Sequence, residues 1–282
     1  MAGEDAGALS FTASLQATCQ SQRSHLCVGL DPDLDDLPEG FERDPEDVLR
    51  YVVAIVEATA EFAAAFKPNS AFYEAMGPAG MEVLQAVVAS VPRELPVILD
   101  VKRGDVGHTA QRYAEVAFDV IGAAAATVSP YLGGDSLGPF LERADRGTFV
   151  VCRTSNPGAR DLQDLDVGGR PLYLEVARRC REWNTRDNVG LVAGATYPEE
   201  LGAIRAECPG QPLLIPGAGA QGGDVAAAAR RAAGEGGDEP FVISASRSLV
   251  KPRQGHDVHA GAAHAARELR DQINAALSRT PI

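Results

Sequence analysis

The sequence alternates short, continuously apolar runs with longer segments in which apolar residues recur at helical spacing. Runs without regular polar positions are typical of strands that are buried on both faces of a parallel sheet. Each return to a parallel strand needs a crossover, and the intervening segments are long enough to supply a helix. The predicted strands are His25–Leu30, Ala64–Pro68, Pro96–Val101, Ala125–Ser129, Thr148–Cys152, Val189–Ala193, Leu213–Pro216 and Phe241–Ala245.

Helical spacing is clearest in Asp47–Glu61, where Val48, Val52 and Ile55 fall on one stripe and the charged residues fall elsewhere. An amphipathic helix of this kind buries its apolar stripe against a sheet. The same spacing predicts helices over Gly80–Ser90, Thr109–Gly122, Pro171–Trp183 and His256–Leu277.

Eight strand–helix units match a closed (β/α)₈ barrel, the TIM-barrel fold, although an open doubly wound sheet would show the same alternation. The positions of the polar residues favour the barrel, because enzyme barrels carry their chemistry where the strands end. We expect one barrel domain over residues 1–282, with residues 1–9 as a flexible N-terminal segment. The polar strand ends are Asp31, Lys67, Asp100-Val-Lys102, Ser129-Pro130, Arg153-Thr-Ser155, Gly194, Gly217-Ala-Gly219 and Ser246-Arg247.

Composition narrows the range of partners. The 282 residues include 26 Lys and Arg against 39 Asp and Glu, a net charge of −13, which argues against a general nucleic-acid binder. A small anionic substrate remains compatible, because it needs only a few donors in one pocket. The acidic start is unlike a signal peptide, and Glu57 and Glu61 interrupt the best membrane-span candidate. Five scattered cysteines without a C-x-x-C motif indicate reduced thiols, so we expect a cytoplasmic protein.

The strongest motif is Leu99-Asp-Val-Lys-Arg-Gly-Asp105, at the end of a predicted strand. Asp100 and Lys102 are two residues apart, so a regular strand places them on the same side. Together with Asp105 they would hold an ammonium group between carboxylates and keep it charged. The alternative interpretation is a solvated, charged loop.

A second motif, Pro216-Gly-Ala-Gly-Ala-Gln-Gly-Gly-Asp224, follows the seventh predicted strand. Its letters fit a dinucleotide fingerprint, but the acidic residue expected about 20 positions later falls in the loop around Asp238. A glycine-rich loop here, with Ser246-Arg247 after the eighth strand, is more typical of the phosphate site of a barrel. Backbone N–H groups and the Arg247 guanidinium would bind the phosphate. A plain glycine turn with a surface arginine is the alternative.

Two possible metal motifs are weak. Asp31-Pro-Asp-Leu-Asp-Asp36 spaces its carboxylates like a calcium loop, but it has Asp36 where the sharp turn needs glycine. His256, His259 and His264 fit a solvated helix face better than a metal cluster. We therefore predict no metal site.

Seven motifs lie in order at the predicted strand ends: Val28–Asp33, Phe66–Glu74, Leu99–Gly107, Ser129–Asp135, Arg153–Gly158, Pro216–Asp224 and Ile243–Ser248. Taken together, they resemble the orotidine 5′-phosphate decarboxylase family in its longer bacterial (type 2) form. Members of that family are (β/α)₈ barrels, usually homodimers with sites at the subunit interface. They convert orotidine 5′-phosphate to UMP and CO₂ in pyrimidine biosynthesis, with neither metal nor organic cofactor.

The resemblance implies catalytic roles for four charged residues. Lys102 is then the proton donor to the pyrimidine carbon that loses CO₂, and Asp100 and Asp105 are its charged partners. Lys67 completes an alternating array of lysine and aspartate. Asp105 and Thr109 resemble the pair that is delivered across the dimer interface.

The remaining implied roles are in substrate binding. Asp31, with Lys67, resembles the group that holds the ribose hydroxyls, and Ser155 resembles the residue that reads the pyrimidine. Gln221 resembles the residue that bridges base and phosphate. The phosphate would be held by Arg247 and by backbone around Gly217, Gly222 and Ser246.

Two other functions stay open at this stage. A Mg²⁺-dependent enzyme acting on sugar phosphates, such as hexulose-phosphate synthase or ketogulonate-phosphate decarboxylase, shares the Asp-x-Lys strand end. A catalytically silent nucleotide-binding barrel is the second alternative. No reading of the sequence favours a nucleic-acid or membrane partner.

Overall fold

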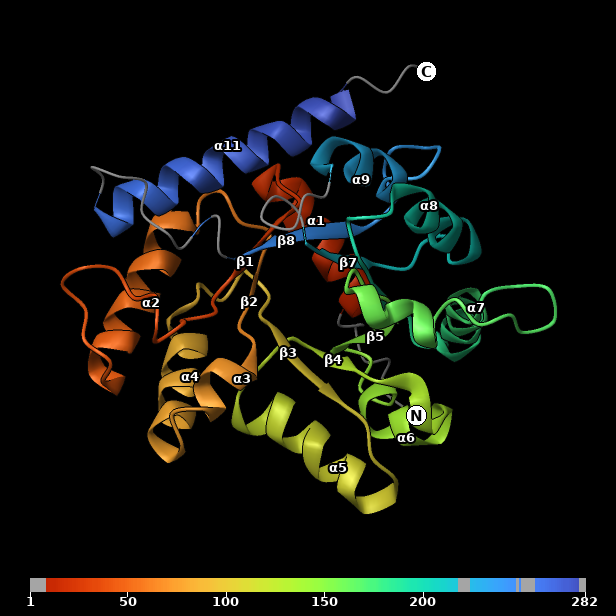
Figure 1. Cartoon of the computed structure of the whole chain (residues 1–282), viewed down its shortest axis with the longest axis horizontal. Helices are drawn as coiled ribbons and strands as arrows, with labels where there is room; N and C mark the ends of the chain where they lie inside the picture. The colour runs from red at the N-terminus through yellow and green to blue at the C-terminus, as the bar shows by residue number, and fades with distance from the viewer. Residues whose placement is uncertain (1–8, 218–223, 247–248, 250–256, 279–282) are drawn as a thin grey trace, which may run out of the picture.

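Eight parallel strands alternate with helices in the computed structural model, which describes residues 9–217, 224–246, 249 and 257–278 (Figure 1). Every predicted strand is confirmed, with its ends shifted by at most two residues. The strands are β1 (Leu26–Gly29), β2 (Ala65–Lys67), β3 (Ile98–Arg103), β4 (Ala125–Val128), β5 (Gly147–Arg153), β6 (Val189–Ala193), β7 (Leu213–Pro216) and β8 (Phe241–Ala245).

The sheet closes on itself. Its strand order runs β2-β1-β8-β7-β6-β5-β4-β3, and parallel bridges pair Phe66 with Val97 and Asn69 with Asp100 across the two end strands. The Asp100 N–H donates to the Pro68 carbonyl at 2.9 Å across this seam. The fold is therefore a (β/α)₈ barrel, and the open doubly wound sheet is excluded.

Helices surround the strands (Figure 1), and each packs against neighbours in the ring, as α2 does against α4 and α11. The structure also contains helices that the sequence pattern did not predict, notably α1 before the first strand and the short α3 and α6. The described α-helices are α1 (Phe11–Gln22), α2 (Pro45–Thr59), α3 (Ser70–Glu74), α4 (Pro78–Ser90), α5 (Gly107–Glu115), α6 (Gly134–Leu141), α7 (Leu172–Trp183), α8 (Pro198–Glu207), α9 (Val225–Ala232) and α11 (Val258–Ser278).

The predicted helix Thr109–Gly122 is confirmed as helical up to Val120, but its second half is not an α-helix. The α-helix α5 ends at Glu115, and Val116–Val120 form a π-helical turn in which the Ile121 N–H donates to the Val116 carbonyl. β-Branched residues weaken the α-helix there, and Gly122 ends the segment with a φ of +80°.

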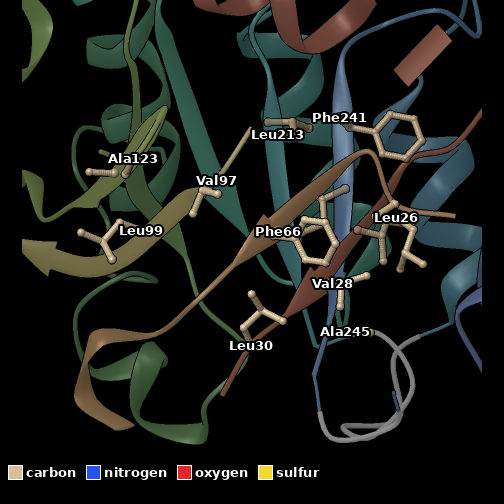
Figure 2. Close-up of a cluster of buried hydrophobic side chains, with 14 of the residues drawn as sticks. Leu26, Val28, Leu30, Phe66, Val97, Leu99, Ala123, Leu213, Phe241 and Ala245 are labelled. Atoms are coloured by element: carbon tan, nitrogen blue, oxygen red, sulfur yellow. The ribbon is translucent and has the colours of Figure 1, made fainter. Parts of the chain in front are cut away.

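Alternation along the strands separates two buried clusters. Figure 2 shows the outer one, where strand residues such as Leu26, Val28 and Phe66 pack toward the helices. Their neighbours Cys27 and Ala65 belong to a second cluster of smaller size, inside the barrel. Successive residues of a strand point to opposite faces, so one strand supplies both clusters.

Helix α1 closes the amino-terminal end of the barrel. The Phe11 and Phe149 rings pack edge to face, with their centroids 5.8 Å apart. The Thr12 N–H donates to the carbonyl of Asp187, just before β6. Leu15 and Cys19 extend the same inner cluster. With this end filled by apolar side chains, the carboxyl-terminal end is the one left for chemistry.

The five cysteines are buried and form no disulfide, as the sequence predicted. Burial raises the pKa of Cys19, Cys27 and Cys208 to about 12, so these thiols stay protonated and unreactive. No helix in the described part of the chain is long and apolar enough to cross a membrane.

We expect Leu15→Ala to lower the free energy of unfolding by about 2–4 kcal/mol, because it leaves a cavity beneath the barrel. Leu15 is 1% exposed in the inner cluster. Urea denaturation measures the change, and the exposed Ser14→Ala on the same helix is the control, with an expected change below about 0.5 kcal/mol. Equal effects of the two substitutions would contradict this role for α1.

Candidate active site

Charged residues occupy the inner face of three neighbouring strands where these reach the carboxyl-terminal end. The residue two positions beyond an inward-facing one also faces inward. Ala65 is therefore followed by Lys67, and Ile98 by Asp100, while Asp31 lies just beyond the end of β1. The order β1-β2 and the bridge between β2 and β3 place these three side chains side by side.

The Asp100 carboxylate is the centre of this group. Its Oδ2 accepts from the Lys67 ammonium at 3.1 Å and from the Asn69 amide at 3.3 Å. Its Oδ1 accepts from the Lys102 ammonium at 2.5 Å and from the Thr127 hydroxyl at 2.8 Å. Asp100 is 8% exposed and Lys67 is 5% exposed, so this is a buried charge with a complete set of donors.

Burial and charge act in opposite directions on this pair. Burial alone would raise the pKa of Asp100, but the Lys67 and Lys102 ammonium groups outweigh it and lower that pKa to about 2. Burial would lower the pKa of Lys67, but Asp31 and Asp100 raise it above its ordinary value. Both groups are therefore charged at neutral pH, and each holds the other in that state.

Asp31 extends the polar group toward β8. Its Oδ1 accepts the Asn69 N–H at 3.0 Å, and its Oδ2 accepts the Ser246 hydroxyl at 2.7 Å. This approach needs glycine at position 29, because a Cβ there would lie 1.8 Å from the Ser246 Oγ. The side chain of Ser246 is thus used to orient Asp31.

Lys102 meets Asp100 as predicted, but not through a regular strand. Lys102 has a φ of +46°, and the pairing of β3 with β4 shifts between Leu99 and Arg103. The predicted contact between Lys102 and Asp100 is present, but the predicted cause, regular alternation along a strand, is wrong. An irregularity in β3 instead turns the Lys102 side chain back over the Asp100 carboxylate. The Lys102 side chain is 48% exposed, so its ammonium lies at the open end.

Asp105 takes a different position. Its Oδ1 accepts the N–H of Val106, and Thr109 lies in the first turn of α5. Among the described residues, Asp100 is the carboxylate that forms an ion pair with Lys102. Contacts of Asp105 and Thr109 with a second chain stay a prediction.

Ser155 follows β5 and lies beside the end of β6. A Cβ on Gly194 would come within 3.2 Å of the Ser155 Cβ, so glycine permits this approach. The preceding Arg153 is buried and donates to Glu200 at 2.6 Å, which ties the loop after β5 to α8.

The structure describes only the two ends of the glycine-rich motif Pro216–Asp224. Gly217 has a φ of +92°, which a residue with a side chain rarely adopts, so the chain turns sharply after β7. Gln221, Gly222 and Arg247 lie outside the described residues.

Two residues of this group were missed by sequence reasoning. Thr127 is the one polar residue within the otherwise apolar β4, and that isolated hydroxyl was the available signal. Asn69 follows Lys67-Pro68 and had no pattern to distinguish it from a helix cap, a function it also performs by accepting the Ala71 N–H.

We expect Asp100→Asn to destabilise the fold near neutral pH, because the Lys67 ammonium stays buried without its counter-charge. The pKa of Asp100 lies below its ordinary value, so the ionised form contributes stability above about pH 4. That contribution, about 2 kcal/mol, is lost as the pH falls toward 2. In urea titrations the gap between wild type and variant should narrow over this window. The exposed Asp145→Asn is the control, and a gap that does not change with pH would contradict the assignment.

Comparison with known proteins places this geometry in a family. Residues 24–260 match the model of the orotidine 5′-phosphate decarboxylase / HUMPS family. An orotidine 5′-phosphate decarboxylase of Roseiflexus castenholzii is 49% identical over 272 residues, which cover 95% of this chain and 99% of the relative.

Solved structures agree with this result. The OMP decarboxylase of Leishmania donovani superposes with a TM-score of 0.85 at 40% identity, covering 96% of this chain and 100% of that one. The UMP synthase of the same organism superposes with a TM-score of 0.87 at 41% identity; the match covers 98% of this chain and 58% of that longer one. The chain belongs to the orotidine 5′-phosphate decarboxylase / HUMPS family.

Proposed function

We propose that this protein decarboxylates orotidine 5′-phosphate to UMP and CO₂, the last step of de novo pyrimidine synthesis. The observation that carries the proposal is the Lys67–Asp100–Lys102 array at the open end of the barrel. Relatives that share up to 49% of the sequence over nearly its full length are named for this reaction.

The array suits the electronic demand of that reaction. Breaking the bond to the carboxylate leaves an electron pair in the plane of the pyrimidine ring, where the π-system cannot delocalise it. A preorganised ammonium stabilises this charge electrostatically and then supplies the proton that replaces CO₂. Lys102 is the half-exposed ammonium of the array, and we assign it as the proton donor. A proton from solvent restores it.

Asp100 and Lys67 keep that ammonium in place. The Asp100 Oδ1 accepts a hydrogen bond from the Lys102 Nζ at 2.5 Å. Lys67 bonds the other oxygen of Asp100 and keeps that carboxylate ionised. The carboxylate therefore fixes the direction in which the proton is delivered. A group held rigidly in this way loses little free energy to reorganisation during the reaction.

The family resemblance supplies the substrate contacts in this proposal. Asp31 and Lys67 hold the ribose hydroxyls, and Ser155 reads the pyrimidine. The residues assigned to the phosphate and its loop are Arg247, Gln221, Gly217, Gly222 and Ser246. Phosphate lies far from the reacting carbon, so its binding energy can be used to hold the base against the charged array.

A homodimer with shared sites completes the proposal. Large apolar side chains are exposed in the segments that follow β3 and β4: Val106, next to Asp105, is 55% exposed, and Tyr131 and Leu132 are 83% and 47% exposed. These two segments approach each other, because a Cβ on Gly104 would lie 3.2 Å from the Ser129 carbonyl oxygen. Exposed apolar side chains grouped in this way are typical of an interface. A second chain on this surface would bring its Asp105 and Thr109 to the site. We also propose a single catalytic domain and a cytoplasmic location.

The alternatives make different demands. A Mg²⁺-dependent sugar-phosphate enzyme would lose activity in a chelator, and a silent nucleotide-binding barrel would bind ligand without turnover. The buried pairing of Lys67 with Asp100 supports the decarboxylase, because it produces a charged array that does not depend on a metal ion.

The first test follows the absorbance loss of orotidine 5′-phosphate with purified protein in excess EDTA. We expect turnover that EDTA does not change, and Lys102→Ala to abolish it, because the proton donor is removed. Arg179→Ala, on the exposed face of α7, is the control for loss of a surface charge. Absence of turnover by folded wild-type protein would contradict the proposal, and restoration by Mg²⁺ would favour the sugar-phosphate enzyme.

The shared site is tested by mixing two inactive variants, Lys102→Ala and Asp105→Ala. A mixed dimer would contain one site with both intact residues, so equilibrated mixtures should regain up to about a quarter of wild-type activity, whereas each variant alone stays inactive. Sedimentation at the assay concentration reports the dimer. A mixture that remains inactive while the subunits demonstrably exchange would refute the shared site.

A further inference from the structure

The irregularity in β3 has an unusual partner on the next strand. Leu99 pairs with Ala126 and Arg103 pairs with Val128, so three residues of β3 lie opposite the single residue Thr127 of β4. A bulge of this kind leaves backbone N–H groups without a ladder partner. Buried N–H groups in that state are destabilising unless something else accepts their hydrogen bonds.

The Thr127 hydroxyl takes the place of the missing ladder acceptor. It accepts the N–H of Val101 at 3.0 Å and the N–H of Lys102 at 2.9 Å. It also donates to the Asp100 Oδ1 at 2.8 Å. A hydroxyl has one donor and two acceptor positions, so these three bonds use its full capacity. Thr127 is 1% exposed, so water has little access to replace it.

These contacts act on the conformation of Lys102. Its φ of +46° lies in the left-handed region, which residues with a Cβ adopt only where the surroundings impose it. The bond to the Lys102 N–H fixes the backbone of that residue, and the bond to Asp100 fixes the carboxylate that its ammonium meets. One hydroxyl therefore contacts both ends of the Lys102–Asp100 ion pair.

We propose that Thr127 is a positioning residue that holds the β3 bulge and thereby aims the Lys102 ammonium. Its catalytic consequence rests on the proposed decarboxylase function, but its structural consequence does not. Thr127 touches no reacting atom in this account and acts through Asp100 and Lys102. The competing interpretation is a threonine that only fills space in the barrel wall.

Thr127→Val tests the proposal, because valine keeps the shape and removes the hydroxyl. We expect kcat to fall by about tenfold to one hundredfold, the cost of a misplaced catalytic group, with KM changed by less than about threefold. Thr127→Ser restores the hydroxyl and should bring kcat to within about threefold of wild type. Single-turnover measurements ensure that the chemical step is compared.

Thr148→Val is the matched control. Thr148 is also fully buried, lies on the adjacent strand β5, and its hydroxyl has no hydrogen-bond partner among the described residues. Its replacement should leave kcat and KM unchanged. Melting curves for all variants show whether each is folded, so that a loss of active protein is separated from a slower reaction. If Thr127→Val does not fold, Thr127→Cys, with a weak donor in place of the hydroxyl, should show the same loss of kcat.

Crystal structures separate this proposal from the proposed function. In Thr127→Val we expect Lys102 to leave the left-handed region and its Nζ to move away from Asp100. That result stands even if wild-type protein shows no turnover, in which case the decarboxylase proposal alone fails. An unchanged Lys102 in the valine variant, an unchanged kcat, or a serine variant as slow as the valine one would overturn the assignment of Thr127.

Discussion

The site depends on one buried carboxylate. Taking the charge of Asp100 out of water costs several kcal/mol unless donors compensate it, and four side chains do so here. These donors come from three consecutive strand ends, so the carboxylate connects β2, β3 and β4 at the open end of the barrel. The same contacts that make the burial tolerable also fix the direction of the Lys102 ammonium.

The two ends of the barrel have different roles: the amino-terminal end contributes stability, and the carboxyl-terminal end carries the charged site. At the amino-terminal end, Phe11 and Leu15 of α1 fill the interior with apolar side chains. Moving along the strands, the inward positions change from Ala65 and Ile98 to the charged Lys67 and Asp100. The apolar layer beneath provides the rigid base and low dielectric in which the ion pairs are strong. Within the charged array, backbone strain lies at the β3 bulge, where Lys102 adopts a left-handed conformation.

Much of this arrangement could be predicted from local pattern. The strands are almost purely apolar, and charges at their ends stand out against that background, so the sequence alone points to Lys67, Asp100 and Lys102. Thr127 and Asn69 were not, because threonine is common in strands and asparagine is common at helix starts. Nothing local distinguishes a threonine whose hydroxyl bonds a distant carboxylate from one, such as Thr148, whose hydroxyl has no partner in the part of the chain that the structure describes.

The sequence by itself determined the order of strands and helices, the reduced thiols and the residues of the charged array, because periodicity and residue type are local properties. Only the tertiary structure decided that the sheet closes between β2 and β3 and that β3 is irregular opposite Thr127. The hydrogen bond from the Ser246 hydroxyl to the Asp31 carboxylate is also set by the tertiary structure, because these residues are more than two hundred positions apart in the sequence. Closure of the sheet, the bulge and the distant hydrogen bonds depend on which strands become neighbours on folding. The residues of one segment do not specify which distant segment will lie beside it.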